Sequence, residues 1–148
     1  MKKMRNLAIT LALSAVGAFA NDHLTQIRDL AGTLEKEFRG IHVAVKDKNF
    51  NTADVRKRVE ATDADVEKLK TLAADFETSS PSLATGPDWK TTKELVALIG
   101  IFHDQKSQLL EGDVTKNRGL LRGQADGLAK RAAMLQESAA RMLKGAGS

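Results

Sequence analysis

Hydrophobic residues recur at alternating steps of four and three along the last part of the chain. The pattern is uninterrupted from Asp113 to Lys144 and is typical of a helix with one buried stripe, of which Asp113 is the expected N-terminal cap. The stripe consists of Leu121, Ala125, Leu128, Ala132, Leu135, Ala139 and Met142. Because one helix cannot bury its own stripe, the pattern predicts that other helices pack against this one.

Two more stripes with the same spacing occupy the first half of the chain. The first helix is expected from about Asp22 to Lys46, with a stripe of Leu24, Ile27, Ala31, Leu34, Phe38, Ile41 and Val45. A short polar turn follows, and Asn51 or Thr52 can cap a second helix with the stripe Val55, Val59, Thr62, Val66, Leu69, Ala73 and Phe76. Two stripes of equal length joined by a short turn predict an antiparallel helical hairpin.

A segment rich in Ser and Pro, residues 78–87, separates this hairpin from the rest of the chain. Asp88 is then expected to cap a third helix that continues to about Glu111. Its apolar face would be Leu95, Leu98, Ile99, Phe102 and Leu109. A turn at Gly112 leads into the last helix. The predicted fold is therefore all-α, an antiparallel up-down-up-down four-helix bundle.

The first twenty residues have the form of a secretory signal peptide. Lys2, Lys3 and Arg5 precede an apolar run, and the segment ends with Ala18-Phe19-Ala20, so cleavage is expected after Ala20. The run is short for a membrane-spanning helix, which needs about 20 apolar residues. We therefore expect one signal segment, 1–20, and one bundle domain, 21–148, that is periplasmic or secreted and does not span the membrane.

Removal of this segment lowers the net positive charge of the remaining chain. The chain has 23 basic and 19 acidic residues, and three of the basic ones lie in the signal segment, which leaves 20 against 19. The nearly balanced domain gives no reason to expect a nucleic-acid partner. The chain has no Cys, so disulfides, thiolate metal sites and Cys nucleophiles are excluded.

Several of these features resemble the soluble periplasmic cytochrome b562 family. They are the helix order, the signal peptide, the short first turn, the Pro-containing central loop and the run Leu109-Leu110-Glu111-Gly112-Asp113-Val114. In that family a Leu-rich third helix ends in an Asn-Glu-Gly-Lys-Val turn, and Gly100 matches a glycine within that helix. The resemblance is best from about Pro87 to Leu128, and it implies a four-helix bundle.

The residues that bind haem in this family do not carry over. Its haem-binding members use a Met early in the first helix and a His late in the fourth, where this chain has Ile27 and Ala132. An alternative is a reversed pair, His23 with Met134 or Met142, which antiparallel packing would bring together and which suits low-spin haem b. Otherwise His23 lies at a helix end and Met142 fills the core. No cofactor is thus expected, and haem b is the alternative.

The two remaining histidines are isolated on their helices. Neither His42 nor His103 has a His or carboxylate at i+3 or i+4 that would form a di-iron motif. His103 lies beside Phe102 at the flank of an apolar face, so a buried, hydrogen-bonded histidine is expected there. No nucleophile–base pair or phosphate-binding loop is present, and the carboxylates are spread along charged faces. We therefore predict neither a metal site nor enzyme activity.

Three glycines spaced by four, Gly119, Gly123 and Gly127, lie on the expected outer side of the last helix. Exposed glycines at three helical positions cost about 3 kcal/mol relative to alanine. One explanation is a groove in which a helix of a partner or of a second copy approaches the backbone, with Arg122 nearby. The other is sequence drift, since Gly-x-x-x-Gly is a strong signal only inside membranes.

Taken together, the sequence predicts an exported periplasmic bundle that acts as a binding or interaction protein, through an unknown protein partner or self-association. The first alternative is a periplasmic b-type haem electron carrier with the reversed ligand pair. The second is a small periplasmic chaperone or metal-stress protein. It is less favoured because the chain has no repeated Leu-Thr-x-x-Gln signature and only four Met.

Overall fold

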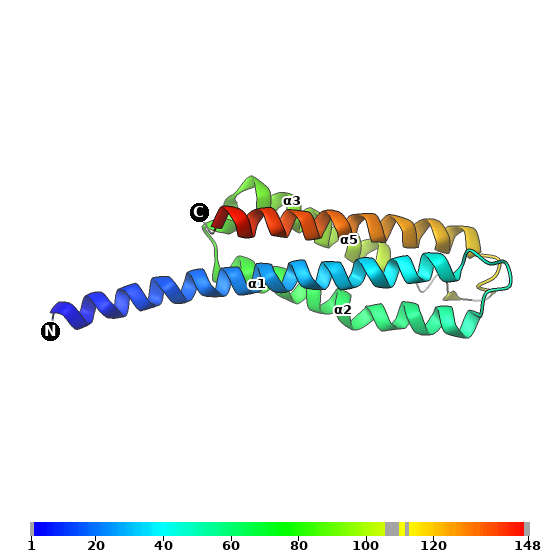
Figure 1. Ribbon diagram of the computed structural model, residues 1–148, viewed down its shortest axis with the longest axis horizontal. Helices are drawn as coiled ribbons and strands as arrows, with labels where there is room; N and C mark the ends of the chain where they lie inside the picture. Colours follow the sequence, from blue (N-terminus) through cyan, green and yellow to red (C-terminus); the bar gives the residue numbers. More distant parts are fainter. Residues whose placement is uncertain (1, 106–109, 112, 147–148) are drawn as a thin grey trace.

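The computed structural model describes residues 2–105, 110–111 and 113–146, with side chains from Ala20 to Gly145 within these ranges. The described residues form α-helices and one short 3-10 helix, and they contain no strand. Figure 1 shows the elements α1 (Lys2–Ala44), α2 (Thr52–Ser79), η1 (Leu83–Thr85), α3 (Pro87–Asp104) and α5 (Arg118–Ala146). The predicted all-α class, with four α-helices, is confirmed for this part of the chain.

The first and last helices lie side by side along most of the bundle (Figure 1) and form its most extensive helix pair. Gly32 of α1 lies against Gln136 of α5, since a Cβ atom on Gly32 would be 3.1 Å from Nε2 of Gln136. Further along α1, Nδ1 of His42 lies 3.2 Å from the Arg122 carbonyl oxygen. Late residues of α1 therefore lie beside early residues of α5.

The core is built from the predicted stripes. All seven residues of the first stripe, of which Val45 directly follows α1, and all seven of the α2 stripe are buried, and Thr62 is the only polar one among them. The α5 stripe is buried from Leu121 to Ala139, and Met142 is partly buried. The spacing of four and three therefore identified the inward faces of these three helices, because hydrophobic burial at helical period fixes how each helix is turned.

The face of α3 differs from the expectation. Leu95 and Ile99 are buried as expected, but Leu98 is exposed, and Leu109 lies outside the described residues. Trp89 and Val96 are buried instead. The inward face of α3 is therefore rotated away from Leu98, and the expected continuation of this helix to Glu111 runs through residues that the structure does not describe.

Three helix starts also differ from the expected ones. α3 begins at Pro87 with Gly86 as its cap, so the prediction that Asp88 caps this helix is wrong, and Asp88 lies in its first turn. α1 begins at Lys2 and is continuous with the predicted signal segment. α5 begins at Arg118, because Oδ1 of Asp113 accepts a hydrogen bond from the Thr115 amide at 3.0 Å and closes a local turn. The prediction that Asp113 caps this helix is therefore wrong. The Asn51 cap of α2 is confirmed, since its side chain accepts from the Asp54 amide at 3.1 Å.

Arg118 joins the start of α5 to the end of α1. Its Nε donates to the Val45 carbonyl oxygen at 2.7 Å, and its Nη2 donates to the Lys46 carbonyl oxygen. Carbonyl groups at the end of a helix have no partner within that helix, and a cation there also interacts favourably with the helix dipole. These two hydrogen bonds hold the start of α5 against the end of α1. Across the described residues, none of the helices is both long enough and apolar enough to cross a membrane.

Candidate functional site

The described surface has a groove of about 430 Å³ between α3 and α5. We call it the α3/α5 groove. Apart from its own helix, a Cβ atom placed on Gly119 or Gly123 would meet no atom of the described residues within 4 Å, so both glycines face space that these residues leave open. The lining residues are Phe102, Gln105, Gly119, Leu120, Gly123, Gln124, Gly127 and Arg131.

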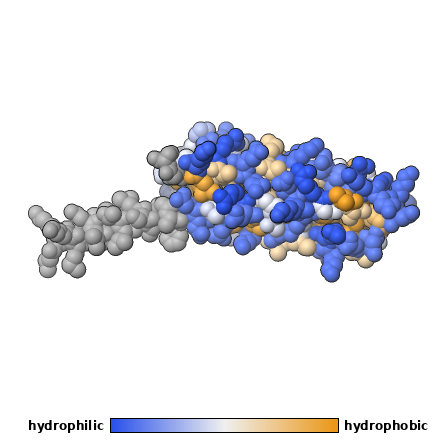
Figure 2. Space-filling model, in the orientation of Figure 1, coloured by the Kyte–Doolittle hydropathy of each residue, from blue (hydrophilic) through white to orange (hydrophobic). Residues whose placement is uncertain are grey.

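The groove follows from a second stripe on α5, offset from the buried one. Leu120, Gly127 and Met134 recur at intervals of seven, which places them on one side of the helix. Leu120 is 67% exposed and Met134 is 54% exposed. Figure 2 shows that the visible face of the molecule is mostly hydrophilic, with separate small hydrophobic patches. α5 thus carries apolar side chains outward as well as inward.

On the side of the groove formed by α3, the guanidinium of Arg131 from α5 lies over the ring of Phe102, with its central carbon 4.4 Å from the ring centroid. Nε2 of Gln124 donates to the Phe102 carbonyl oxygen at 3.2 Å and so ties α5 to the end of α3. A Cβ atom on Gly127 would be only 2.9 Å from Nη1 of Arg131. The absence of a side chain at Gly127 therefore leaves room for Arg131 to lie back over Phe102.

Two acidic side chains of the helices that form the groove make ion pairs with lysines that do not line it. Asp126 of α5 pairs with Lys130 at 2.9 Å, and this hydrogen bond holds the pKa of Asp126 below its ordinary value, with help from the charges of His42 and Arg39 on α1. Asp104 of α3 pairs with Lys70 of α2 at 3.4 Å. Arg131 is therefore the only charged residue that lines the groove, and no ion pair engages it within the described ranges.

Arg122, the basic residue that the sequence placed beside the glycines, is exposed but does not line the groove. Its carbonyl oxygen contacts His42 of α1, as described above. The sequence analysis missed the roles of Phe102 and Arg131. The available signal was the position of Arg131 four residues after Gly127, since i and i+4 residues lie above one another on a helix.

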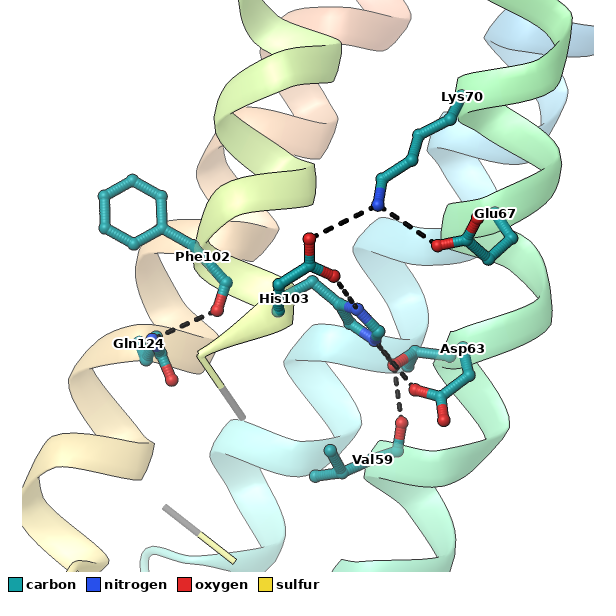
Figure 3. A network of polar contacts seen from close by, with 9 residues as sticks. Val59, Asp63, Glu67, Lys70, Phe102, His103 and Gln124 are labelled. Atoms are coloured by element: carbon teal, nitrogen blue, oxygen red, sulfur yellow. Dashed lines mark hydrogen bonds and ion pairs between the residues drawn. The ribbon is translucent and has the colours of Figure 1, made fainter. Parts of the chain in front are cut away.

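His103 is buried between α2 and α3 and lies outside the groove (Figure 3). Its Nε2 lies 2.8 Å from Oγ1 of Thr62 and 3.1 Å from Oδ1 of Asp63. Because Thr62 donates its hydroxyl hydrogen to the Val59 carbonyl oxygen at 2.6 Å, the Nε2–H of His103 must be the donor to Thr62. The expected buried, hydrogen-bonded histidine is confirmed, and it joins α3 to α2.

The three candidate haem ligands lie in different surroundings. Met142 is partly buried, and its Sδ accepts a hydrogen bond from Thr92 of α3 at 3.5 Å. It lines a groove of about 250 Å³ together with Leu24, the neighbour of His23. Nδ1 of His23 is buried without a hydrogen-bond partner among the described residues. Met134 is exposed on the outer stripe, whereas Met142 lies near the part of α1 that carries His23.

Within the described ranges, no three His, Asp or Glu side chains gather into a group that could hold a metal ion.

Comparison with known proteins gives no match, whether to a family model, to a curated protein or to a solved structure. The resemblance to the cytochrome b562 family therefore stays a prediction that depends on the residues quoted for it.

The open space over Gly123 gives a stability prediction. Gly123→Ala is expected to raise the free energy of unfolding by about 1 kcal/mol, because alanine is favoured in helix interiors and its Cβ would meet no neighbour. Gly100→Ala is the matched control, since a Cβ there would be 2.9 Å from Cε of Lys70 and should give a smaller gain. Urea unfolding followed by circular dichroism measures both changes. An unchanged or lowered stability of Gly123→Ala would contradict this description of the groove.

Proposed function

We propose that the protein is an exported helical bundle whose function is to bind a helix of another protein in the α3/α5 groove. The observation that carries this proposal is the open space over Gly119 and Gly123, beside exposed Leu120. Small residues on one side of a helix let a second backbone approach closely, and exposed apolar side chains are where binding energy is gained.

Energetics support a role for these glycines. Each glycine costs about 1 kcal/mol relative to alanine in a helix interior. Gly127 has a use within the chain, because it makes room for Arg131. Gly119 and Gly123 have no such use among the described residues, so a bound helix is the contact that would offset their cost.

The proposed architecture is the antiparallel up-down-up-down bundle, and the pairing of late α1 residues with early α5 residues supports it. We further propose that segment 1–20 directs export and is removed near Ala20, which would place the domain in the periplasm. The support for export remains the charged start, the apolar run and the small residues of that segment.

The two alternatives have less support. A haem carrier with the reversed ligand pair would need Met134 or Met142 turned towards His23, but Met134 is exposed and the sulfur of Met142 is directed at Thr92. A metal-stress protein would need a ligand cluster, and the described residues hold none. A chaperone that shields unfolded clients would use a broad apolar surface, whereas the visible face has small separate patches (Figure 2).

The proposal is tested by selection from a displayed library of amphipathic helical peptides against residues 21–148. We expect enriched peptides that bind the parent and lose binding to Gly123→Leu, because a leucine side chain there would occupy the groove, while its Cβ would meet no described atom outside its own helix within 4 Å. Circular dichroism establishes that the variant is folded. Ala140→Leu is the matched control on an exposed position of the same helix. A selection that yields no peptide sensitive to Gly123→Leu would reject the proposed function.

A further inference from the structure

We infer that the helix bound in the α3/α5 groove presents a carboxylate to Arg131 and an apolar stripe to Leu120 and the glycines. This inference deepens the proposed function and depends on it. It identifies the partner by its chemistry, as an amphipathic helix with an acidic residue at the centre of its bound face.

The charges around the groove favour an acidic occupant. Among the described residues, Arg131 is the only charged one that lines the groove. Asp126 of α5 pairs with Lys130, and Asp104 of α3 pairs with Lys70, so the ion pairs of these two carboxylates do not involve Arg131. A carboxylate from another protein could therefore bind Arg131 in the groove.

The placement of Arg131 also suits a carboxylate. The central carbon of its guanidinium lies 4.4 Å from the centroid of the Phe102 ring, and no ion pair engages its N–H donors among the described residues, so a carboxylate of a partner could bind them in a bidentate manner. The cation is already held in place, so less side-chain freedom is lost on binding than for an extended surface arginine. A partly covered pair of this kind is stronger than one in open water, where attraction is weak.

A second copy of this chain fits less well. From Arg118 to Ala146, α5 carries six basic and two acidic residues. Contact between two α5 helices through their grooves would bring basic surfaces together, and like charges at an interface oppose binding. An acidic helix of a different protein meets the same surface with opposite charge. Self-association through the groove is therefore the competing outcome in the test.

The test repeats the library selection in parallel on the parent and on Arg131→Met, which keeps the apolar stem but removes the charge. Peptides enriched on the parent should carry Asp or Glu at one position of the apolar face, and this preference should disappear on Arg131→Met. Lys130→Met is the matched control, because Lys130 is the neighbouring cation but does not line the groove. Selection on that variant should keep the acidic preference.

The strongest peptide then gives a direct measurement by fluorescence anisotropy. Its Glu→Gln form should bind the parent about tenfold more weakly, and the two forms should bind Arg131→Met equally. Peptides that depend on Gly123 but show no acidic preference would overturn this inference and leave the proposed function standing. Sedimentation of a parent dimer that Gly123→Leu converts to monomer would replace the acidic partner with a second copy. Absence of any Gly123-dependent peptide would reject both.

Discussion

Replacing Trp89 with Ala is expected to lower the free energy of unfolding by about 3–5 kcal/mol, a large part of the stability of a small domain. Trp89 is 1% exposed and packs on Phe76 of α2, with ring centroids 4.3 Å apart. Its Nε1 donates to Oε1 of Glu77 at 2.9 Å. The hydrogen bond from Lys93, followed by this bond from Trp89, holds the pKa of Glu77 below its ordinary value. One side chain thus joins the start of α3 to the end of α2 by packing and by a charge-assisted hydrogen bond.

Trp89→Phe separates these two contributions. It keeps most of the apolar contact with Phe76 and removes the donor to Glu77, so its cost should be about 1–2 kcal/mol. Urea unfolding followed by far-ultraviolet circular dichroism measures both variants, because Trp89 is the only tryptophan and fluorescence would be lost with it. A cost below about 1 kcal/mol for Trp89→Ala would mean that α3 does not depend on this anchor.

The stability of the bundle is expected to fall as pH rises from about 4.5 to 7, because of a carboxyl pair between α1 and α2. Burial, followed by a hydrogen bond with Asp65 and repulsion from its charge, raises the pKa of Glu37 from 4.5 to about 7. Oε2 of Glu37 is buried without a hydrogen-bond partner among the described residues. A proton on Glu37 is therefore what lets the two carboxyls lie together.

The direction of this change in stability follows from the pH at which the folded and the unfolded state each lose the proton of Glu37. Below the unfolded pKa both states hold it, and the full contribution to stability is present. Between 4.5 and 7 only the folded state holds it, so stability decreases with pH and levels off above 7. One pKa unit corresponds to about 1.4 kcal/mol. Because Glu37 is only partly buried, we expect a loss of about 1–3 kcal/mol, below the full value for a buried group.

Glu37→Gln should remove this pH dependence. The variant should match the parent near pH 4 and exceed it by about 1–3 kcal/mol at pH 8, since an amide can bond the Asp65 carboxylate without a proton. Glu60→Gln is the matched control, an exposed change on α2. Urea unfolding across the pH range measures all three proteins. Parallel stability curves for the parent and Glu37→Gln would contradict the shared proton.

The hydrophobic pattern predicted the helices and their inward faces because burial acts on each helix separately. A stripe such as Leu24 to Val45 must face the core wherever its partners lie. The prediction that Leu98 faces the core was wrong, because α3 has more apolar residues than one face can bury. The helix is turned so that Trp89 is buried and Leu98 is exposed. The prediction for Asp113 was wrong as well, because its side chain accepts a hydrogen bond within a local turn. An Asp can cap a helix or stabilise a turn, and residue type alone does not decide between the two.

Contacts between helices could not be predicted from the sequence, because they depend on how each helix is rotated and shifted along its axis relative to the next. Glu37 and Asp65 read as ordinary members of charged faces, and only packing of α1 on α2 makes them a pair. Likewise, the glycines indicated a groove, but the stacking of Arg131 on Phe102 required the register of α5 on α3. The chemistry of the site is therefore a property of the assembled bundle.

The pairing of α1 with α5 has a consequence for how the chain folds. The largest helix interface joins the two ends of the sequence, so it cannot form until the last helix has been synthesised. Closing so long a loop is entropically costly, and folding slows as contacts become more distant along the chain. A chain with this topology therefore keeps its largest helix interface unformed until α5 has been synthesised.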